Sequence, residues 1–215
     1  CQPMRPIYDD GSAAFSGEVV ADDYRQIKKE IKDAEEAFRT VFSGRAQSVR
    51  WRSAITFLSL AGYVACQARA ADLIVTSVNA DGSAFDDSRS MHVGDLIMQA
   101  GRPVLIVPRD VKELKLKNVL VGWKGTRETR RAVMDALPLL KMAKQVSVVE
   151  VSADDPRALG HVKDVAEWLG RHGIEADALV LPARGADASR LGTYAREEGV
   201  DLLVAGAYGH NRLRE

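Results

Sequence analysis

The chain alternates short apolar runs with stretches of helical periodicity, and this order limits the possible folds more than any other feature. Short runs rich in apolar residues occupy residues 72–77, 103–108, 118–123, 146–151 and 201–206. Runs of this length are typical of strands buried on both faces of a parallel sheet. Helices between such strands cover both faces through right-handed crossovers. The sequence therefore predicts an α/β fold built from doubly wound, Rossmann-like parallel sheets.

Further elements are expected in the first half of the chain. Apolar residues three and four apart predict a one-sided helix that ends near Gly44, after an extended piece and a loop. Residues 47–53 predict a strand, and residues 56–70 predict a second helix. A third helix is expected to begin at a Ser90 cap and to end before Gly101, which suits the left-handed position after a helix.

Helix boundaries in the second half follow from proline and from capping residues. Pro138 is expected to kink its helix or to break the last turns, because proline lacks the N–H that the helix needs. Asp155 and Pro156 predict a cap and a first helical position. Asp187 or Ser189 is expected to cap the helix that precedes the last strand.

An internal similarity indicates two copies of one domain. Ala-Arg followed by Asp-Leu-Ile-Val at residues 68–75 recurs as Ala-Arg followed by Asp-Leu-Leu-Val at residues 195–204. The order of strands and helices around both segments also agrees. We therefore expect two tandem domains, residues 1–112 and residues 113–215, joined by a charged linker.

Composition argues against several classes of partner. Lysine plus arginine equals aspartate plus glutamate, 30 each, so neither nucleic acid nor an anionic membrane is expected as a partner. No apolar run reaches the roughly 18 residues of a membrane span. Cys66 lies in an alanine-rich stretch and is expected to be a small buried residue. With two cysteines and no signal-peptide pattern, a reducing cytoplasm is the expected location.

Four segments resemble the universal stress protein family in its tandem form: residues 101–108, 118–126, 136–140 and 200–210. The resemblance implies domains of five parallel strands in the order 3-2-1-4-5. On that template the first domain lacks its opening strand and helix, and the second lacks its last helix and strand. It also implies a protein of the stress response.

The resemblance implies an adenine-nucleotide site, for ATP or AMP, where the first and fourth strands of the second domain end. Gly206, Tyr208 and Gly209 belong to a Gly-x-x-Gly segment, which is half of the family's phosphate-binding pattern. The alternative is a turn that ends a strand and binds nothing. His210 follows and would bond a phosphate, or is a solvated loop residue.

Four residues at the end of the first strand and one on the second complete this candidate site. Lys124 stands where nucleotide-binding members carry an aspartate, so it either neutralises a phosphate or is a solvated turn residue. Gly125 forms the turn and Thr126 is expected to be the helix N-cap. Val151 aligns with a position whose backbone meets adenine, or is a strand-end valine. Trp123 is the tryptophan to test as a ligand contact.

The remaining candidate residues are expected to be structural. Trp51 and Trp168 are assigned to packing. The loop after residue 77 lacks the glycine pair and carries Asp81, Asp86 and Asp87, which would repel a phosphate. The first domain is therefore expected to bind no nucleotide and to serve packing or dimerisation.

Three functions remain open from the sequence. The first is a stress-response protein that binds an adenine nucleotide and acts by binding or assembly. The second is a ligand-free scaffold that self-associates through sheet edges, with residues 104–107 as the available edge. The third is an enzyme that hydrolyses ATP or adenylates a substrate, for which the sequence offers no acid–base pair, no phosphate-binding P-loop and no cluster with metal-ligand spacing.

Overall fold

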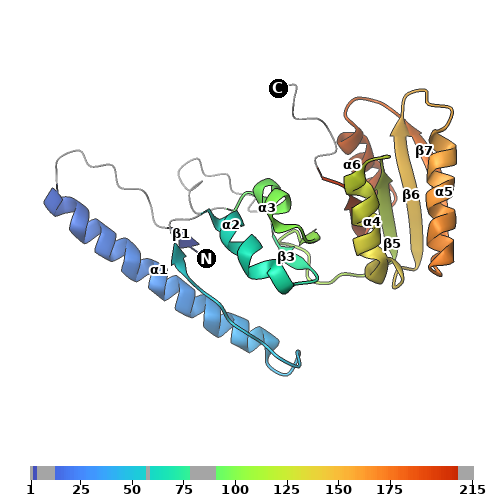
Figure 1. The fold of residues 1–215 in the computed structure, drawn as a ribbon. Coiled ribbons are helices and arrows are strands. Elements are labelled where there is room, and N and C mark those ends of the chain that lie inside the picture. Colours follow the sequence, from blue (N-terminus) through green and yellow to red (C-terminus); the bar gives the residue numbers. More distant parts are fainter. Residues whose placement is uncertain (1, 4–12, 57–58, 78–90, 208–215) are drawn as a thin grey trace. The chain divides into compact units, whose positions relative to one another are not determined.

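The chain forms two compact units in a computed structural model that describes residues 2–3, 13–56, 59–77 and 91–207. Unit 1 covers residues 1–108 and unit 2 covers residues 109–215. Strands and helices alternate in both units, as the sequence predicts (Figure 1).

The described residues of unit 1 form two small parallel sheets and three α-helices. Strand β1 (Gln2–Pro3) pairs with β2 (Ile55–Thr56), and β3 (Ile74–Thr76) pairs with β4 (Val104–Ile106). The helices are α1 (Ala13–Phe42), α2 (Leu60–Gln67), which continues as a 3-10 turn over Ala68–Ala70, and α3 (Val93–Ala100).

The core of unit 1 lies on one face of the β3–β4 pair. Ala61 and Ala68 from the α2 segment and Leu96 from α3 pack on Ile74. Val75 points to the other face and is 62% exposed, because successive residues of a strand alternate between faces. Helices α2 and α3 therefore share one face of this pair.

Three expectations for unit 1 need correction. Residues 47–53 are not a strand; the strand follows at β2, and the Trp51 ring packs on Phe38 with centroids 5.3 Å apart. Helix α1 begins at Ala13, where a loop was expected. The N-cap of α3 is His92, while Ser90 lies outside the described residues. The expected role of Gly101 is confirmed by its φ of 57° after α3.

Unit 2 contains a four-stranded, fully parallel sheet in the order β7-β6-β5-β8. Its elements are β5 (Asn118–Trp123), α4 (Arg127–Leu140), β6 (Gln145–Ser152), α5 (Ala158–Arg171), β7 (Ala176–Pro182), α6 (Asp187–Glu197) and β8 (Leu202–Ala205). Numbered within the unit, this order is 3-2-1-4, so it agrees with the expected topology for every strand described.

Helices cover both faces of this sheet, which confirms the doubly wound prediction. Val119 and Val121 of β5 face α4 and α5, with Val133, Val162 and Leu169 among their neighbours. Leu120 faces the opposite side, where Leu191 and other residues of α6 pack. Gly122 also faces α6, and a Cβ there would lie 3.0 Å from Leu191 Cδ1.

Helix boundaries differ from the expectations at three places. Helix α4 runs through Pro138 to Leu140, because a proline two residues before the end removes one bond and leaves the earlier turns intact. Helix α5 begins at Ala158 after an Arg157 cap, later than Asp155 suggested. Helix α6 has Ala186 at its N-cap, so neither expected residue caps it.

The amino end of β5 is fixed by a carboxylate from the start of β8. Asp201 Oδ2 accepts hydrogen bonds from the backbone N–H groups of Lys117, at 2.8 Å, and Asn118, at 3.0 Å. The backbone N–H of Asp201 donates to the Asn118 carbonyl at 2.9 Å. The two bonds to the carboxylate hold the pKa of the Asp201 carboxyl below its usual range, and the bond from the Asn118 N–H has the larger effect.

The carboxyl end of β8 lies against the first turn of α4. A Cβ added to Gly206 would lie 2.5 Å from the backbone nitrogen of Thr129 and 2.8 Å from the Glu128 carbonyl carbon. No side chain fits at such distances, so the contact requires glycine. The close approach brings the N-terminus of α4 next to the segment that leaves β8.

Replacing Asp201 with alanine is expected to lower the melting temperature at pH 7, because two strand N–H groups lose their acceptor. Since the pKa of Asp201 is lowered in the folded chain, its contribution exists above the ordinary value of 3.8 and is lost as the pH falls through the lowered value. The melting temperatures of wild type and Asp201→Ala, measured by circular dichroism, should therefore approach each other as the pH is lowered from 7 to 2. Asp135→Ala, an exposed change on α4, is the control, and equal melting temperatures at pH 7 would contradict the assignment.

Gly206→Ala is expected to destabilise unit 2 by about 2–3 kcal/mol, the usual cost of forcing extra atoms into a packed contact. Gly125→Ala is the matched control, because an added Cβ there meets nothing within 4 Å. That control should stay within about 0.5 kcal/mol of wild type in urea unfolding. Equal stability of the two variants would show that the β8–α4 contact is looser than described here.

Candidate functional site

The predicted site lies where β5, β6 and β8 end at one edge of the sheet of unit 2. β5 pairs with β6 on one side and with β8 on the other, with Gly122 opposite both Val149 and Ala205. The chain proceeds from β5 through β6 to β7 and then crosses back to β8. In parallel α/β sheets, ligands bind at the carboxyl ends of the strands where the order reverses. β5 and β8 are therefore neighbouring strands that end at the same edge.

The turn after β5 forms a capped helix start, as predicted. Thr126 Oγ1 accepts a hydrogen bond from the Thr129 N–H at 3.3 Å and lies 3.2 Å from Thr129 Oγ1. Arg130 donates to the Gly125 carbonyl at 3.0 Å. The N-cap role of Thr126 is confirmed, and the first turn of α4 faces the site edge with its positive end.

Lys124 is exposed, as expected of a turn residue, and it also has a charged partner. Its ammonium lies 3.0 Å from Oδ2 of Asp187, the first residue of α6, and both side chains are a little under half exposed. The ion pair joins the end of β5 to the start of α6. The positive charge of Lys124 would suit a phosphate, but the Asp187 carboxylate would compete with the phosphate for the lysine ammonium.

Trp123 and Val151 do not face the same side of the sheet. Trp123 packs against the core below α4 and α5, whereas Val151 packs against the cluster below α6. Alternation along adjacent strands causes this, since Trp123 lies opposite Glu150 in the register. Their side chains therefore do not form one wall. Tyr208, Gly209 and His210 lie outside the described residues.

Gly206 has a structural explanation that the sequence did not reveal. Its missing side chain leaves room for the first turn of α4, so the glycine is needed whether or not a ligand binds. Trp168 confirms its packing role, since it contacts the α4–α5 core and its ring lies 4.5 Å from that of His172.

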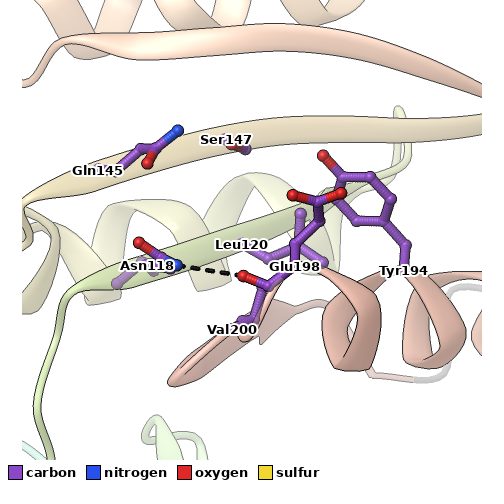
Figure 2. A pocket seen from close by; sticks show the side chains of 8 residues that line it. Asn118, Leu120, Gln145, Ser147, Tyr194, Glu198 and Val200 are labelled. Carbon is purple, nitrogen blue, oxygen red and sulfur yellow. Dashed lines mark hydrogen bonds between the residues drawn. The ribbon is translucent and has the colours of Figure 1, made fainter.

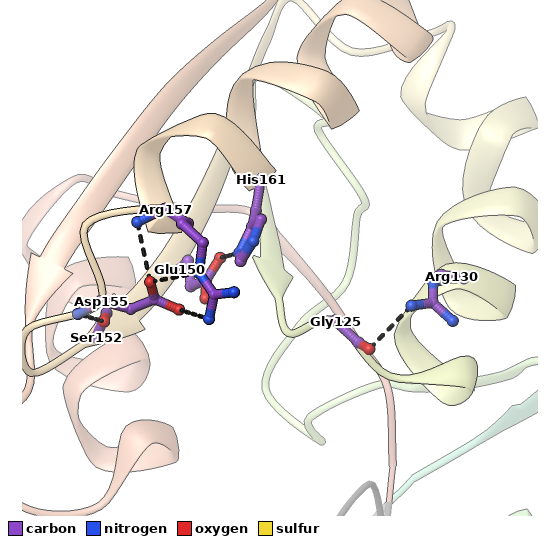
Figure 3. A network of polar contacts seen from close by, with 7 residues as sticks. All are labelled: Gly125, Arg130, Glu150, Ser152, Asp155, Arg157 and His161. Carbon is purple, nitrogen blue, oxygen red and sulfur yellow. Dashed lines mark hydrogen bonds and ion pairs between the residues drawn. The ribbon is translucent and has the colours of Figure 1, made fainter.

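Sequence reasoning missed a polar network at the end of β6 (Figure 3). Oε2 of Glu150 lies 3.5 Å from Nδ1 of His161, on the first turn of α5. Asp155, in the loop between them, pairs with Arg157 at 3.1 Å, and its N–H donates to Ser152 Oγ. Glu150 and His161 are eleven residues apart, so no local spacing indicates their contact; only the packing of α5 on β6 brings them together.

Burial and charge shift the two carboxyl groups of this network in opposite directions. Burial raises the pKa of the Glu150 carboxyl, and His161 offsets part of that rise. The Arg157 side chain and its backbone N–H lower the pKa of the Asp155 carboxyl. Glu150 is thus the more basic carboxylate of the two.

A pocket lies at the opposite end of the strands from the predicted site (Figure 2). It is lined by the amino ends of β5 and β6, by α6 and by the segment that follows α6: Asn118, Val119, Leu120, Gln145, Ser147, Tyr194, Glu198 and Val200. Burial, with Glu198 and Asp177 nearby, raises the pKa of Tyr194. This pocket does not coincide with the candidate nucleotide site.

Three further findings concern Cys66, metal-ligand clusters and membrane-spanning helices. Cys66 is exposed, so the expectation that it is buried was wrong. Among the described residues no group of three or more His, Cys, Asp or Glu side chains is placed to hold a metal ion. No helix there has the length and apolarity to cross a membrane.

Comparison with known proteins gives matches among solved structures alone. No family model matches the sequence, and no curated protein matches it. A universal stress protein from Archaeoglobus fulgidus aligns over 97% of this chain and 73% of its own length, with 16% identity and a TM-score of 0.63. A member of the universal stress protein family from Burkholderia pseudomallei aligns over 43% of this chain and 83% of its own, with 23% identity and a TM-score of 0.39.

The first of these alignments is the informative one, because it includes both units and its TM-score exceeds one half. At 16% identity it concerns the arrangement of the backbone, which agrees with the parallel sheet of unit 2 and its covering helices. The chain therefore has the fold of the universal stress proteins.

Proposed function

We propose that unit 2 binds an adenine nucleotide, ATP or AMP, and that the chain acts by binding or assembly in a cytoplasmic stress response rather than as an enzyme. The observation that carries the proposal is the pairing of β5 with both β6 and β8, which puts the reversal of strand order at the predicted edge. The N-terminus of α4 lies at the same edge and favours negative charge.

Lys124 and Asp187 would set the affinity for the phosphates. In the free protein Asp187 holds the lysine ammonium at 3.0 Å. A phosphate that took this ammonium would have to displace the carboxylate or share the lysine with it. The ion pair is therefore expected to weaken ATP binding without affecting adenosine.

Equilibrium dialysis with ATP and with adenosine tests this function. Wild type should bind ATP at millimolar concentration or below. Asp187→Asn should raise ATP affinity by about two- to fivefold, the range of a partly exposed ion pair, and Lys124→Ala should lower it by a similar factor. Lys163→Ala, an exposed lysine change on α5, is the control. Absence of ATP binding at millimolar nucleotide would overturn the proposal.

A second candidate function, self-association as a ligand-free scaffold, is supported by the edge of β4. Among the described strands β4 pairs with β3 alone. Two hydrogen bonds fix the register of β3 and β4. The Ile74 N–H donates to the Pro103 carbonyl, and the Val107 N–H donates to the Thr76 carbonyl. Val104 and Ile106 therefore direct their backbone groups away from β3, and Ile106 is 40% exposed. Such an edge is available to another strand.

Sedimentation velocity at micromolar concentration would separate the two candidates. If β4 mediates association, the wild-type chain should be a dimer. Ile106→Pro should then make it a monomer, because proline removes an outward N–H and spares the bonds to β3. Val49→Pro, in an exposed segment outside any strand, should remain dimeric. A wild-type chain that is monomeric would exclude the scaffold.

A further inference from the structure

Glu150 is a carboxylate in an unfavourable place. Its side chain is 15% exposed, and its Oε2 is buried without a hydrogen-bond partner among the described residues. A buried charge without hydrogen bonds is costly unless an opposite charge compensates it. In the folded chain the raised pKa of Glu150 reflects that cost.

The charged groups around Glu150 come from three elements, and one of them is a histidine. Lys124 at the end of β5 attracts the carboxylate but is paired with Asp187. Asp155 in the β6–α5 loop repels it and is paired with Arg157. His161 on α5 faces Oε2 directly. Imidazole is the side chain that ordinarily changes charge between about pH 5 and pH 8.

We propose that Glu150 and His161 form a proton-operated latch, which holds the first turn of α5 against the end of β6 when the imidazole is protonated. A protonated ring presents an Nδ1–H bond and a positive charge to the buried Oε2. Hydrogen bonds between ionised partners are about twice as strong as neutral ones. Loss of the proton leaves the buried carboxylate facing a neutral ring.

The raised pKa of the Glu150 carboxyl reflects the cost of its ionised form in the folded chain. Because the pKa of Glu150 is raised on folding, its favourable contribution is complete below the ordinary value of 4.5 and is lost as the pH rises through the raised value. An ionised Glu150 is therefore destabilised in the folded chain, and a proton on His161 compensates it. The latch is closed while the imidazole carries this proton and loosens when the proton leaves, so it weakens as the pH rises.

The segment that responds is the loop between β6 and α5. Its internal bonds are the Asp155 N–H to Ser152 Oγ, at 3.1 Å, and the Arg157 N–H to Asp155 Oδ1, at 2.9 Å. Asp155 and Arg157 lie close to Glu150 (Figure 3), and Glu150 is the most buried of the four side chains, at 15% exposed against 33% for Asp155 and 42% for His161. Opening the latch therefore releases the loop from the sheet at the residues that follow Val151.

Hydrogen exchange of the full chain, followed by mass spectrometry, tests the latch without any nucleotide. After correction for intrinsic exchange rates, protection of amides 153–160 should fall about tenfold between pH 5.5 and pH 8 in wild type, as expected for weakening one charged hydrogen bond. In Glu150→Gln and in His161→Gln, protection should be the same at both pH values. Peptides from β8 should stay protected throughout.

His172→Gln is the matched control, because His172 caps the carboxyl end of the same helix, where its ring lies tilted against that of Trp168. It should keep the wild-type pH dependence in amides 153–160. The latch is disproved by pH-independent protection in wild type, by unchanged pH dependence in both Glu150→Gln and His161→Gln, or by equal loss of that dependence in His172→Gln. None of these outcomes bears on nucleotide binding, so the two proposals fail separately.

Discussion

The double pairing of β5 determines the organisation of unit 2. Among the described strands, β5 connects the β6–β7 pair on one side to β8 on the other. The Asp201 carboxylate fixes where β5 begins, and therefore also which residues lie at its other end. The positions of Lys124, of the α4 N-terminus and of the end of β8 all follow from that register.

The elements with the strongest apolar runs were predictable, because burial on both faces leaves little freedom in their composition. The strands at residues 118–123 and 146–151 are found at nearly their expected bounds. The strand predicted at residues 47–53 was wrong. Tryptophan is common in strands, but the Trp51 ring packs on Phe38 of helix α1. Pro138 misled because its cost depends on distance from the helix end, which the sequence does not state.

The strands and the helix start that would form the candidate site were predictable, but their contacts were only partly so. The Thr126 cap follows from local sequence, since a cap involves residues three apart. The Lys124–Asp187 pair and the Glu150–His161 contact each join two elements, so neither has a local signal. The sides of the sheet on which Trp123 and Val151 lie could have been predicted. Strand alternation and register determine them once the pairing of β5 with β6 is known. The buried position expected for Cys66 failed since an alanine-rich helix has an outer face as well.

The close contact between Gly206 and the first turn of α4 affects how this region is compared across related sequences. Two constraints, one from helix packing and one from a bound phosphate, would each exclude every residue except glycine at this position. A glycine retained there by relatives would accordingly be uninformative about whether they bind a nucleotide. Residues free of the packing constraint, such as the one at position 124, are the places where sequence variation would carry information about the ligand.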